Sequence, residues 1–319
     1  MRYGLTGATG FVGGILARQL REGGHEVVAL VRDRDRAGRL VDLGVELVAG
    51  DLSDVGAIEH VCTGVDGFFH VAGWYKVGSR NPDEGWRVNV DGTRNALTAA
   101  QRAGVPRVVY TSTLAVNSDT GGAVVDEAYR FTGKHLSTYD QTKAAAHDVA
   151  MEFAAAGLPV VVAMPGLVYG PGDTALTGSL MRNVVAGRTV LVPAKGGVCW
   201  GHVEDIAAGH VLAMTKGVPG SSYMLAGPRA PLVDGLRRLA ALAGTKRPIA
   251  LPTAFVAMTE AAMGFVGRVL PLPPDFAAES LRAGLATYYG TPAKAERELG
   301  WTCRDLDRGL ADVVRALRS

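Results

Sequence analysis

The first thirty residues contain the feature that most narrows the possible folds. A short apolar run, Arg2 to Thr6, is followed by Gly7, Gly10 and Gly13 and then by a helical pattern. A second run, Glu26 to Val31, is apolar without alternation, as expected of a strand that is covered on both faces. A strand, a glycine turn, a helix and a second strand make a βαβ unit.

The same alternation continues along the chain and predicts a sheet of parallel strands. We expect further strands at residues 45–49, 67–71, 108–111, 160–164 and 222–226, and helices at 54–61, 92–102 and 139–156. Such alternation predicts an α/β fold, a Rossmann doubly wound parallel sheet with helices on both faces. Ligands then gather at the carboxyl ends of the strands.

The pattern changes after residue 165, which predicts a second, smaller lobe. A glycine–proline loop spans residues 166–173, and proline-punctuated helical patterns follow at 178–186, 203–216, 232–243, 253–270, 292–299 and 306–317. We therefore expect a dinucleotide-binding domain of residues 1–168 plus roughly 200–226. The remainder, roughly 169–199 plus 227–319, is expected to form a mostly helical substrate-binding lobe.

The glycine turn predicts a phosphate site. Glycine allows backbone N–H groups to approach a pyrophosphate at the N-terminus of a helix. An ordinary glycine turn is the alternative, but the βαβ context favours a dinucleotide site.

Basic residues after the second strand favour NADP(H) over NAD(H). Arg32, Arg34 and Arg36 follow this strand, and a guanidinium group suits a ribose 2′-phosphate. Asp33 lies among them and points the other way, because a carboxylate there would bind a ribose 2′-hydroxyl. A solvated charged loop is the other interpretation. Asp51, after the third strand, could place a carboxylate near the adenine amino group or cap the following helix.

Tyr139 and Lys143 are four residues apart and share one face if their segment is helical. Ser137 followed by Asp140 predicts an N-terminal capping pair, and the alanine-rich run that follows favours a helix. A nearby ammonium lowers the pKa of a phenol, which can then exchange a proton near neutral pH. A surface helix is the alternative interpretation of this spacing.

Composition excludes several classes of partner. The 33 basic and 31 acidic residues give a net charge of +2, which argues against a nucleic-acid surface. The three distant cysteines, Cys62, Cys199 and Cys303, suggest reduced thiols in the cytoplasm, and no cysteine–histidine cluster suggests a metal. The apolar stretch Thr253 to Pro271 is too short and interrupted for a membrane span, and the chain begins directly with a strand-like run. We expect a cytoplasmic protein without a membrane partner.

Motifs spread over the whole chain carry a family resemblance. The sequence resembles the extended short-chain dehydrogenase/reductase superfamily (NAD-dependent epimerase/dehydratase family), and within it the dihydroflavonol-4-reductase-like branch. The motifs are Thr6 to Gly13, Gly50 to Leu52, His70 to Gly73, Asn89 to Thr93, Tyr110 to Thr113, Tyr139 to Lys143, Pro165 to Asp173, His202 to Asp205 and Lys294 to Trp301.

The resemblance implies a catalytic set. Tyr139 would be the proton donor and acceptor, and Lys143 would bind the nicotinamide ribose and lower the tyrosine pKa. Thr113 would orient the substrate carbonyl, with Ser112 as the fallback, and Asn89 would lie near the active site.

The resemblance also implies the cofactor contacts. They are Gly7, Thr9, Gly10, Phe11, Val12, Arg32, Arg36, Asp51, Leu52, Val71, Ala72, Gly73, Tyr139, Lys143, Pro165 and Val168.

Aromatic residues suggest the substrate side of the site. Trp74 and Tyr75 follow the fourth strand and could line a pocket for an aromatic or apolar substrate, although loop packing explains them as well. Trp200 stands where nucleotide-sugar relatives commonly carry an arginine, which argues against a nucleotide-sugar substrate. Asn89 and Thr113 complete the candidate substrate residues.

We therefore predict an NADP(H)-dependent oxidoreductase that interconverts a carbonyl and an alcohol on a hydrophobic small molecule. The alternatives are an NAD-dependent sugar-nucleotide epimerase or dehydratase of the same fold, and a non-catalytic NADP(H) sensor. The alanine-rich helices at 92–102 and 139–156 would allow close helix packing between subunits, and we expect a homodimer.

Overall fold

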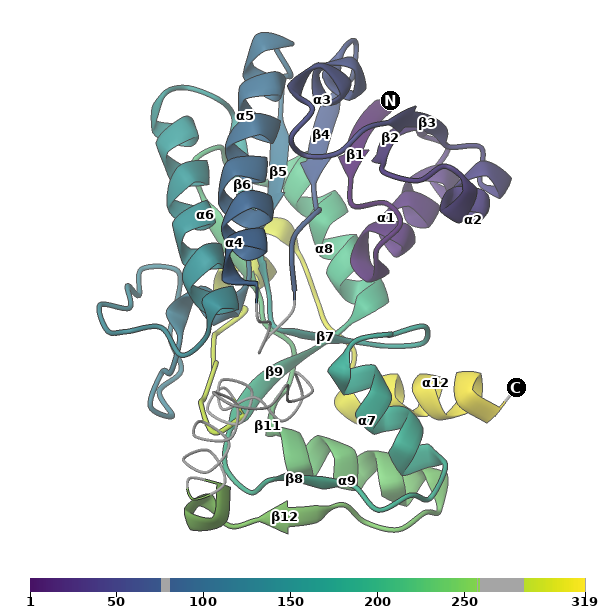
Figure 1. The fold of residues 1–319 in the computed structure, drawn as a ribbon, viewed down its shortest axis with the longest axis vertical. Coiled ribbons are helices and arrows are strands. Elements are labelled where there is room, and N and C mark those ends of the chain that lie inside the picture. Colours follow the sequence, from purple (N-terminus) through teal and green to yellow (C-terminus); the bar gives the residue numbers. More distant parts are fainter. Residues whose placement is uncertain (76–80, 257, 259–283, 319) are drawn as a thin grey trace.

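Seven parallel strands form the central sheet of the computed structural model, which describes residues 1–75, 81–256, 258 and 284–318. The order of the strands is β10-β6-β5-β4-β1-β2-β3, and every neighbouring pair is parallel. The predicted doubly wound sheet is confirmed, with all seven predicted strands in it (Figure 1). Their bounds are β1 Arg2–Thr6, β2 Glu26–Val31, β3 Glu46–Ala49, β4 Gly67–His70, β5 Val108–Thr111, β6 Val160–Pro165 and β10 Ser222–Leu225.

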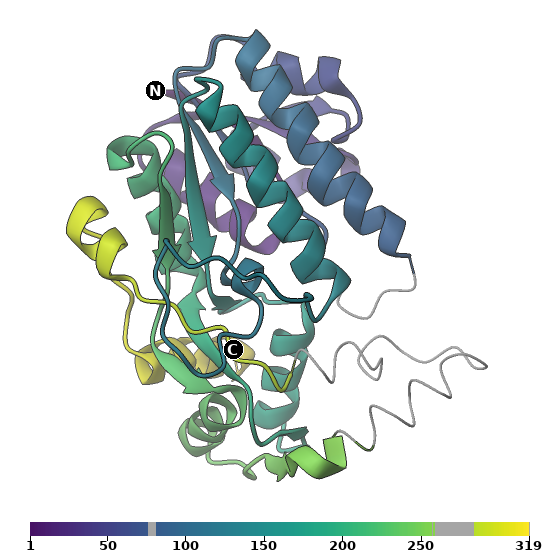
Figure 2. The same cartoon turned by 90° about the vertical axis from the view of Figure 1, so that its left-hand side faces the viewer.

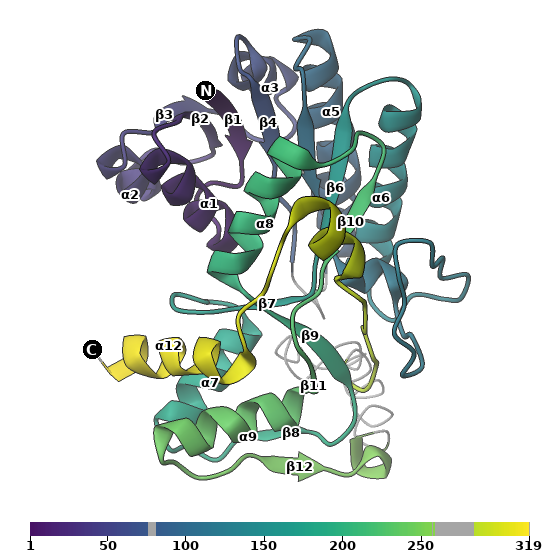
Figure 3. The ribbon, with the colours of Figure 1, turned by 180° about the vertical axis from the view of Figure 1, so that it is seen from behind.

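Helices cover both faces of this sheet. One layer contains α3 (Val55–Cys62), α5 (Gly92–Arg102) and α6 (Thr138–Ala155), and Figure 2 shows α5 and α6 side by side. The other layer contains α1 (Phe11–Glu22) and α8 (Val203–Lys216), seen from behind in Figure 3. Side chains of β5 alternate between two cores, since Val108 and Tyr110 join one and Val109 the other.

Shorter elements connect this framework. They are η1 Asp35–Ala37, α2 Gly38–Asp42, α4 Pro82–Gly85, η2 Trp86–Asp91, η3 Leu114–Asn117 and η5 Ala295–Leu299.

The smaller lobe lies beyond the carboxyl ends of the strands and contains more sheet than predicted (Figure 1). Its helices are α7 (Leu176–Val185), α9 (Leu232–Ala243) and α12 (Leu306–Arg318). A three-stranded sheet has the order β11-β9-β7, and β12 pairs with β8. These strands are β7 Leu167–Tyr169, β8 Leu191–Pro193, β9 Gly197–His202, β11 Arg229–Pro231 and β12 Ile249–Leu251.

The prediction of a pure loop at residues 166–173 was therefore wrong. Three of these residues form β7, which pairs with β9 some thirty residues later, and so short a strand has no readable periodicity. β7 and β9 each cross a predicted domain boundary, so the division of the chain into two domains stays a prediction.

The predicted helix at 253–270 lies mostly outside the described residues, which show only its start, residues 253–256. Within the described part of the chain, no helix has both the length and the apolar character needed to cross a membrane.

Candidate active site

The glycine turn after β1 leaves no space for larger residues. Gly7 has φ +79°, and a Cβ atom on it would lie 2.6 Å from the backbone nitrogen of Ala72. A Cβ atom on Gly13 would lie 2.1 Å from the carbonyl oxygen of Gly7. Both positions therefore require glycine, because backbone atoms cannot move aside as a flexible side chain can.

The N-terminus of α1 is open to an anion. Gly10 is its N-cap, and across Gly10–Glu22, which the structure describes in full, no side chain caps the helix and its first turn carries no acidic residue. Free N–H groups and the positive end of the helix dipole favour a phosphate here. Thr9, Phe11 and Val12 belong to this turn, so these residues fit the pyrophosphate of a dinucleotide.

The arginines beyond β2 have different roles. Arg34 donates a hydrogen bond to the carbonyl oxygen of Leu47 at 2.9 Å, which ties it to β3. The side chains of Arg32 and Arg36 are exposed. They are the two that could bind a 2′-phosphate.

Asp51 lies beyond β3, where the adenosine half of a dinucleotide would be expected. Its Oδ1 accepts hydrogen bonds from the Ser53 hydroxyl at 2.5 Å and the Ser53 amide at 2.7 Å. These bonds, with Arg87 and Arg32 nearby, lower the pKa of Asp51. Asp54, and not Asp51, caps α3 by accepting a hydrogen bond from Ala57 at 2.9 Å.

The middle of the proposed cofactor path follows β4 and the neighbouring strands. Val71, Ala72 and Gly73 directly follow β4, and the Ala72 amide donates to the Thr6 hydroxyl at 3.3 Å. Leu52 is half-buried and packs against α5. Pro165 ends β6 and Val168 lies in β7, at the carboxyl edge of the sheet.

Tyr139, the tyrosine predicted to be catalytic, is held at the start of α6 by the predicted capping pair. Ser137 accepts a hydrogen bond from the Asp140 amide at 3.0 Å and donates to the Asp140 carboxylate at 2.7 Å. Tyr139 follows in the first turn, and the Thr113 side chain lies close to its phenol. The structure thus brings together the two side chains expected to act on one substrate oxygen.

Lys143 is on the same face of α6 but is bonded to β5. Its Nζ donates to the Thr111 carbonyl oxygen at 2.7 Å and to the Tyr110 hydroxyl at 3.1 Å. Burial lowers the pKa of Lys143 to about 7.

The expected low pKa of Tyr139 was therefore wrong for this structure. Burial raises the pKa of Tyr139, the nearby phenol of Tyr75 adds to this, and the nearby Thr113 side chain lowers it in part. Burial therefore determines the direction in which the pKa of Tyr139 shifts, because the Lys143 ammonium, which could lower this pKa, donates its hydrogen bonds to β5.

Ser112, the fallback for Thr113, is directed elsewhere. Its hydroxyl lies 2.9 Å from Nδ1 of His147, one turn beyond Lys143 on α6. Burial, together with Arg130 and Lys143, lowers the pKa of His147 to about 4. Thr113 is the hydroxyl that faces Tyr139.

Two of the proposed substrate residues are structural. Trp200 is fully buried in the core of the smaller lobe, where it packs edge-on against Tyr169 and directly against Gly235. Trp74 is buried against Gly85, and its indole N–H donates to Glu84 at 3.1 Å. For Trp200 the substrate prediction was wrong, and for Trp74 the structure matches the loop-packing alternative.

Asn89 holds the loop after β4, which contains Trp74. Its amide oxygen accepts from the Trp74 backbone at 2.7 Å, and its amide nitrogen donates to the Trp74 carbonyl and to Thr142 at 3.1 and 3.0 Å. Because both ends of the amide are engaged, Asn89 ties the loop after β4 to α6 and does not offer these groups to a substrate.

Tyr75 and Tyr288 surround the catalytic tyrosine. The Tyr75 ring meets the Tyr139 ring edge-on. The Tyr288 hydroxyl donates to the Asp140 carboxylate at 3.2 Å, which places a residue from near the C-terminus beside the start of α6. No local sequence pattern joins Tyr288 to Asp140.

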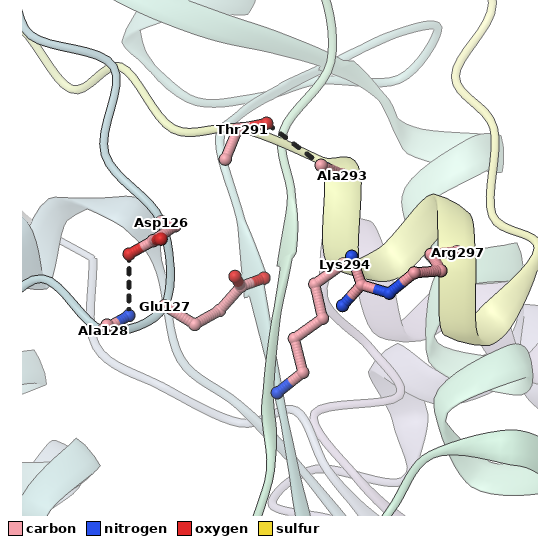
Figure 4. Close-up of a pocket in the computed structure, with 7 residues that line it drawn as sticks. All are labelled: Asp126, Glu127, Ala128, Thr291, Ala293, Lys294 and Arg297. Carbon is pink, nitrogen blue, oxygen red and sulfur yellow. Dashed lines mark hydrogen bonds between the residues drawn. The ribbon is translucent and has the colours of Figure 1, made fainter.

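A pocket of about 450 Å³ lies elsewhere, between the loop of residues 126–128 and the segment before α12 (Figure 4). Its charged lining consists of Asp126, Glu127, Lys294 and Arg297, and Glu127 accepts a hydrogen bond from the Met224 amide at 2.8 Å. None of the residues predicted for the cofactor or for catalysis lines it. Within the described ranges, no group of three or more metal-ligating side chains could hold a metal ion.

Comparison with known families decides the family. The sequence model of the NAD dependent epimerase/dehydratase family matches residues 4–226, well over half of the chain. The chain belongs to the NAD dependent epimerase/dehydratase family. Membership in this family, part of the extended short-chain dehydrogenase/reductase superfamily, makes the protein an NAD(P)-dependent enzyme and confirms the predicted resemblance.

Individual family members extend over nearly the whole chain. A putative dihydroflavonol 4-reductase of Synechocystis sp. is 33% identical and covers 97% of this chain and 92% of its own. Sterol demethylase protein B of Methylococcus capsulatus is 32% identical, with 98% and 97% covered. Among solved structures, that of gox2253 is 30% identical with a TM-score of 0.84, and covers 100% of this chain and 98% of its own.

Proposed function

We propose that the protein reduces a ketone or aldehyde on a hydrophobic small molecule with NADPH, and catalyses the reverse oxidation with NADP+. The observation that carries this proposal is the closeness of Thr113 to Tyr139, with Lys143 one turn further along α6. All three lie at the carboxyl edge of the sheet that carries the glycine turn, where this fold binds its ligands.

The proposed chemistry divides the work among these side chains. The nicotinamide, when bound, supplies the hydride for the carbonyl carbon. Thr113 donates a hydrogen bond to the carbonyl oxygen, and Tyr139 gives its phenolic proton to the same oxygen. The raised pKa of Tyr139 keeps the phenol protonated at neutral pH, which suits the direction of reduction. Lys143 holds the nicotinamide ribose and supports the developing phenolate.

The preference for NADP(H) is supported by Arg32 and Arg36. Both side chains are exposed just beyond β2, while Arg34 is occupied by the backbone of β3. Two free guanidinium groups favour a 2′-phosphate through charge-assisted hydrogen bonds.

The substrate class is supported by the aromatic surroundings of Tyr139 and by two relatives. Tyr75 presents an exposed ring beside the catalytic phenol. The names of the relatives refer to a dihydroflavonol and a sterol, both largely apolar carbon skeletons. We therefore propose a substrate with a ring system or an alkyl chain next to its carbonyl group.

An NAD-dependent epimerase or dehydratase is the second candidate, and the family description favours it. Such an enzyme returns the hydride to its own substrate and consumes no cofactor. The fully buried Trp200, which leaves no cation at that position for a diphosphate, speaks against it. The conjunction of Thr113, Tyr139 and Lys143 also speaks against a sensor without catalysis.

A screen of NADPH oxidation tests the proposal. The purified protein is incubated with aldehydes, cyclic ketones, flavanones, 3-oxo-steroids and long-chain oxo-esters, with NADPH or NADH, and the product alcohol is measured alongside the cofactor. Parallel incubations contain nucleotide sugars with NAD+. Stoichiometric alcohol formation with NADPH supports the proposal. Isomerised nucleotide sugar without net cofactor oxidation would support the second candidate instead.

The assembly and compartment remain predictions. The helices α5 and α6 lie next to each other. Ala96, Ala99 and Ala100 of α5 are fully buried in the chain's own core, so close packing of a second copy would fall to the half-buried Ala144 and Ala145 of α6. The three cysteines are unpaired in the structure, which suits a reducing cytoplasm. Sedimentation equilibrium would test the expected homodimer.

A further inference from the structure

A row of buried polar side chains connects Lys143 to the glycine turn. The Lys143 ammonium donates to the Tyr110 hydroxyl at 3.1 Å. Burial raises the pKa of Tyr110, and the neighbouring Thr93 side chain lowers it in part. The Thr93 hydroxyl lies 3.1 Å from Nε2 of His70, and Nδ1 of His70 lies 2.8 Å from the Thr6 hydroxyl. None of these five residues is more than 5% exposed. They form one continuous polar path in a hydrophobic core.

The topology of the sheet places these residues in line. β5, β4 and β1 are neighbours, with Tyr110 directly opposite His70 and His70 directly opposite Thr6. The rings of His70 and Tyr110 stack with centroids 5.7 Å apart. The path therefore crosses the carboxyl ends of three strands, from the catalytic helix to the residue just before Gly7.

The chemistry of the groups sets the direction of the hydrogen bonds. An ammonium can only donate, so the Tyr110 oxygen accepts from Lys143 and the Tyr110 proton goes to Thr93. The path proposed here has Thr93 donating to Nε2 of His70. The ring proton of His70 is left on Nδ1, where it is donated to Thr6.

The path holds at most one charge near neutral pH, on Lys143. Burial is the main cause that lowers the pKa of His70, to about 3, and of His147 on the other side of Lys143, to about 4. Both imidazoles are therefore neutral when Lys143 is charged. The position of the ammonium then depends on its two acceptors on β5, the Tyr110 hydroxyl and the Thr111 carbonyl.

We propose that Tyr110 is a positioning residue for the catalytic lysine, and that its hydroxyl, through Thr93, His70 and Thr6, fixes Lys143 relative to the glycine turn. The proposal rests on the function proposed above, in which Lys143 acts in catalysis. The benefit is geometric, because the ribose of a dinucleotide must meet Lys143 while its pyrophosphate lies at the turn. A rigid path between Lys143 and the glycine turn keeps the ribose contact and the pyrophosphate contact at a fixed separation.

Tyr110→Phe tests the proposal, because it deletes the hydroxyl and keeps the ring. The ring lies under the ammonium, with Nζ 4.8 Å from its centroid. Tyr223→Phe is the matched control. Tyr223 is also fully buried on a strand, and its hydroxyl is bonded to Glu298 and the Val218 amide, away from Lys143.

Two NMR measurements give readouts that do not require activity. The chain has only seven lysines and seven histidines, so Lys143 titration and the His70 ring nitrogens can be followed by isotope labelling and assigned with Lys143→Gln and His70→Gln. Wild type should show the Nδ1–H tautomer of His70. Tyr110→Phe should lower the pKa of Lys143 by about one unit, the worth of one hydrogen bond to a charged group. Tyr223→Phe should change neither property.

Kinetics then connect the path to the reaction. The alkaline limb of the kcat/KM profile should move to lower pH in Tyr110→Phe, and stay in place in Tyr223→Phe. The Nε2–H tautomer in wild type, or an unchanged Lys143 titration in Tyr110→Phe, would overturn the proposal. If Tyr110→Phe does not fold, the tautomer of wild type decides alone. If wild type reduces no carbonyl compound but both NMR results hold, the proposed function fails and the structural path stands.

Discussion

The ring of Tyr75 meets the ring of Tyr139 edge-on, with centroids 4.8 Å apart and ring planes at 84°. Tyr75 is 51% exposed, so it presents an aromatic surface directly beside the catalytic phenol. A bulky substrate that brings its carbonyl to Tyr139 would contact this surface.

Tyr75→Ala should therefore raise KM for ring-containing ketones about fivefold, since an aromatic contact contributes about 1 kcal/mol. The KM for a small aliphatic ketone should hardly change. Tyr75→Phe keeps the ring and should behave like wild type with both substrates. Equal losses with small and large ketones would show that Tyr75 acts on Tyr139 and not on the substrate.

The contact between Thr113 and Tyr139 predicts a graded series. Thr113→Val removes the hydroxyl at nearly constant size and should lower kcat about 100-fold, the typical loss for one donor to a developing oxyanion. Thr113→Ser keeps the hydroxyl and should retain most activity. Ser112→Ala is the neighbouring control, because the Ser112 hydroxyl is bonded to His147. A larger loss in Ser112→Ala than in Thr113→Val would exchange the two assignments.

Arg32 should determine cofactor choice. Arg32→Ala should weaken NADPH binding about 10- to 100-fold and leave NADH binding within a factor of about two, because a charge-assisted contact to phosphate contributes roughly 1.5–3 kcal/mol. Fluorescence titration with both cofactors measures this. Arg34→Ala loses a bond to Leu47 instead and should leave the NADPH/NADH ratio unchanged. If the ratio of NADPH to NADH affinity is unchanged in the double variant Arg32→Ala/Arg36→Ala, these two arginines do not form a 2′-phosphate site.

Lys143 should make stability depend on pH. Its pKa is about 7 in the folded protein against 10.5 as the reference value for lysine, so between these values the unfolded chain binds more protons. The stability of wild type should therefore rise from pH 7 to pH 9, by up to about 2 kcal/mol from this group. Lys143→Met should lack this rise, whereas Lys195→Met, at an exposed position, should keep it.

Urea unfolding of the three proteins without added cofactor, at pH 7 and pH 9, measures the effect. If the free energy of unfolding changes equally between pH 7 and pH 9 in wild type and in Lys143→Met, the Lys143 ammonium is solvated in the folded protein.

The large sheet could be predicted from the sequence because its strands are apolar, mostly buried and separated in turn by helices. The strands of the smaller lobe have three to six residues and pair across long sequence separations, so β7 and β9 left no periodic signal. Trp200 shows the limit for single residues. A tryptophan next to a family motif can lie in a cleft or in a core, and only tertiary packing against Tyr169 distinguishes the two.

The sequence predicted which residues are candidates for the site better than it predicted their pKa values. Motif spacing brought Thr113, Tyr139 and Lys143 onto one list of candidates, and the structure places Thr113 against Tyr139. The pKa of Tyr139 was not predictable, because it depends on burial and on where the Lys143 ammonium points. Tyr110 belongs to the site through its hydroxyl, and a strand pattern reports only that such a residue is buried.

The transfer of deuterium from C4-deuterated NADPH to a ketone substrate tests the central claim most directly. The account predicts an alcohol that carries one deuterium on the former carbonyl carbon, with one NADPH consumed for each alcohol formed. Tyr139→Phe should slow this transfer by about 1,000-fold or more while binding NADPH almost normally. An alcohol without deuterium, no alcohol at all across the screen, or rapid transfer by Tyr139→Phe would contradict the account.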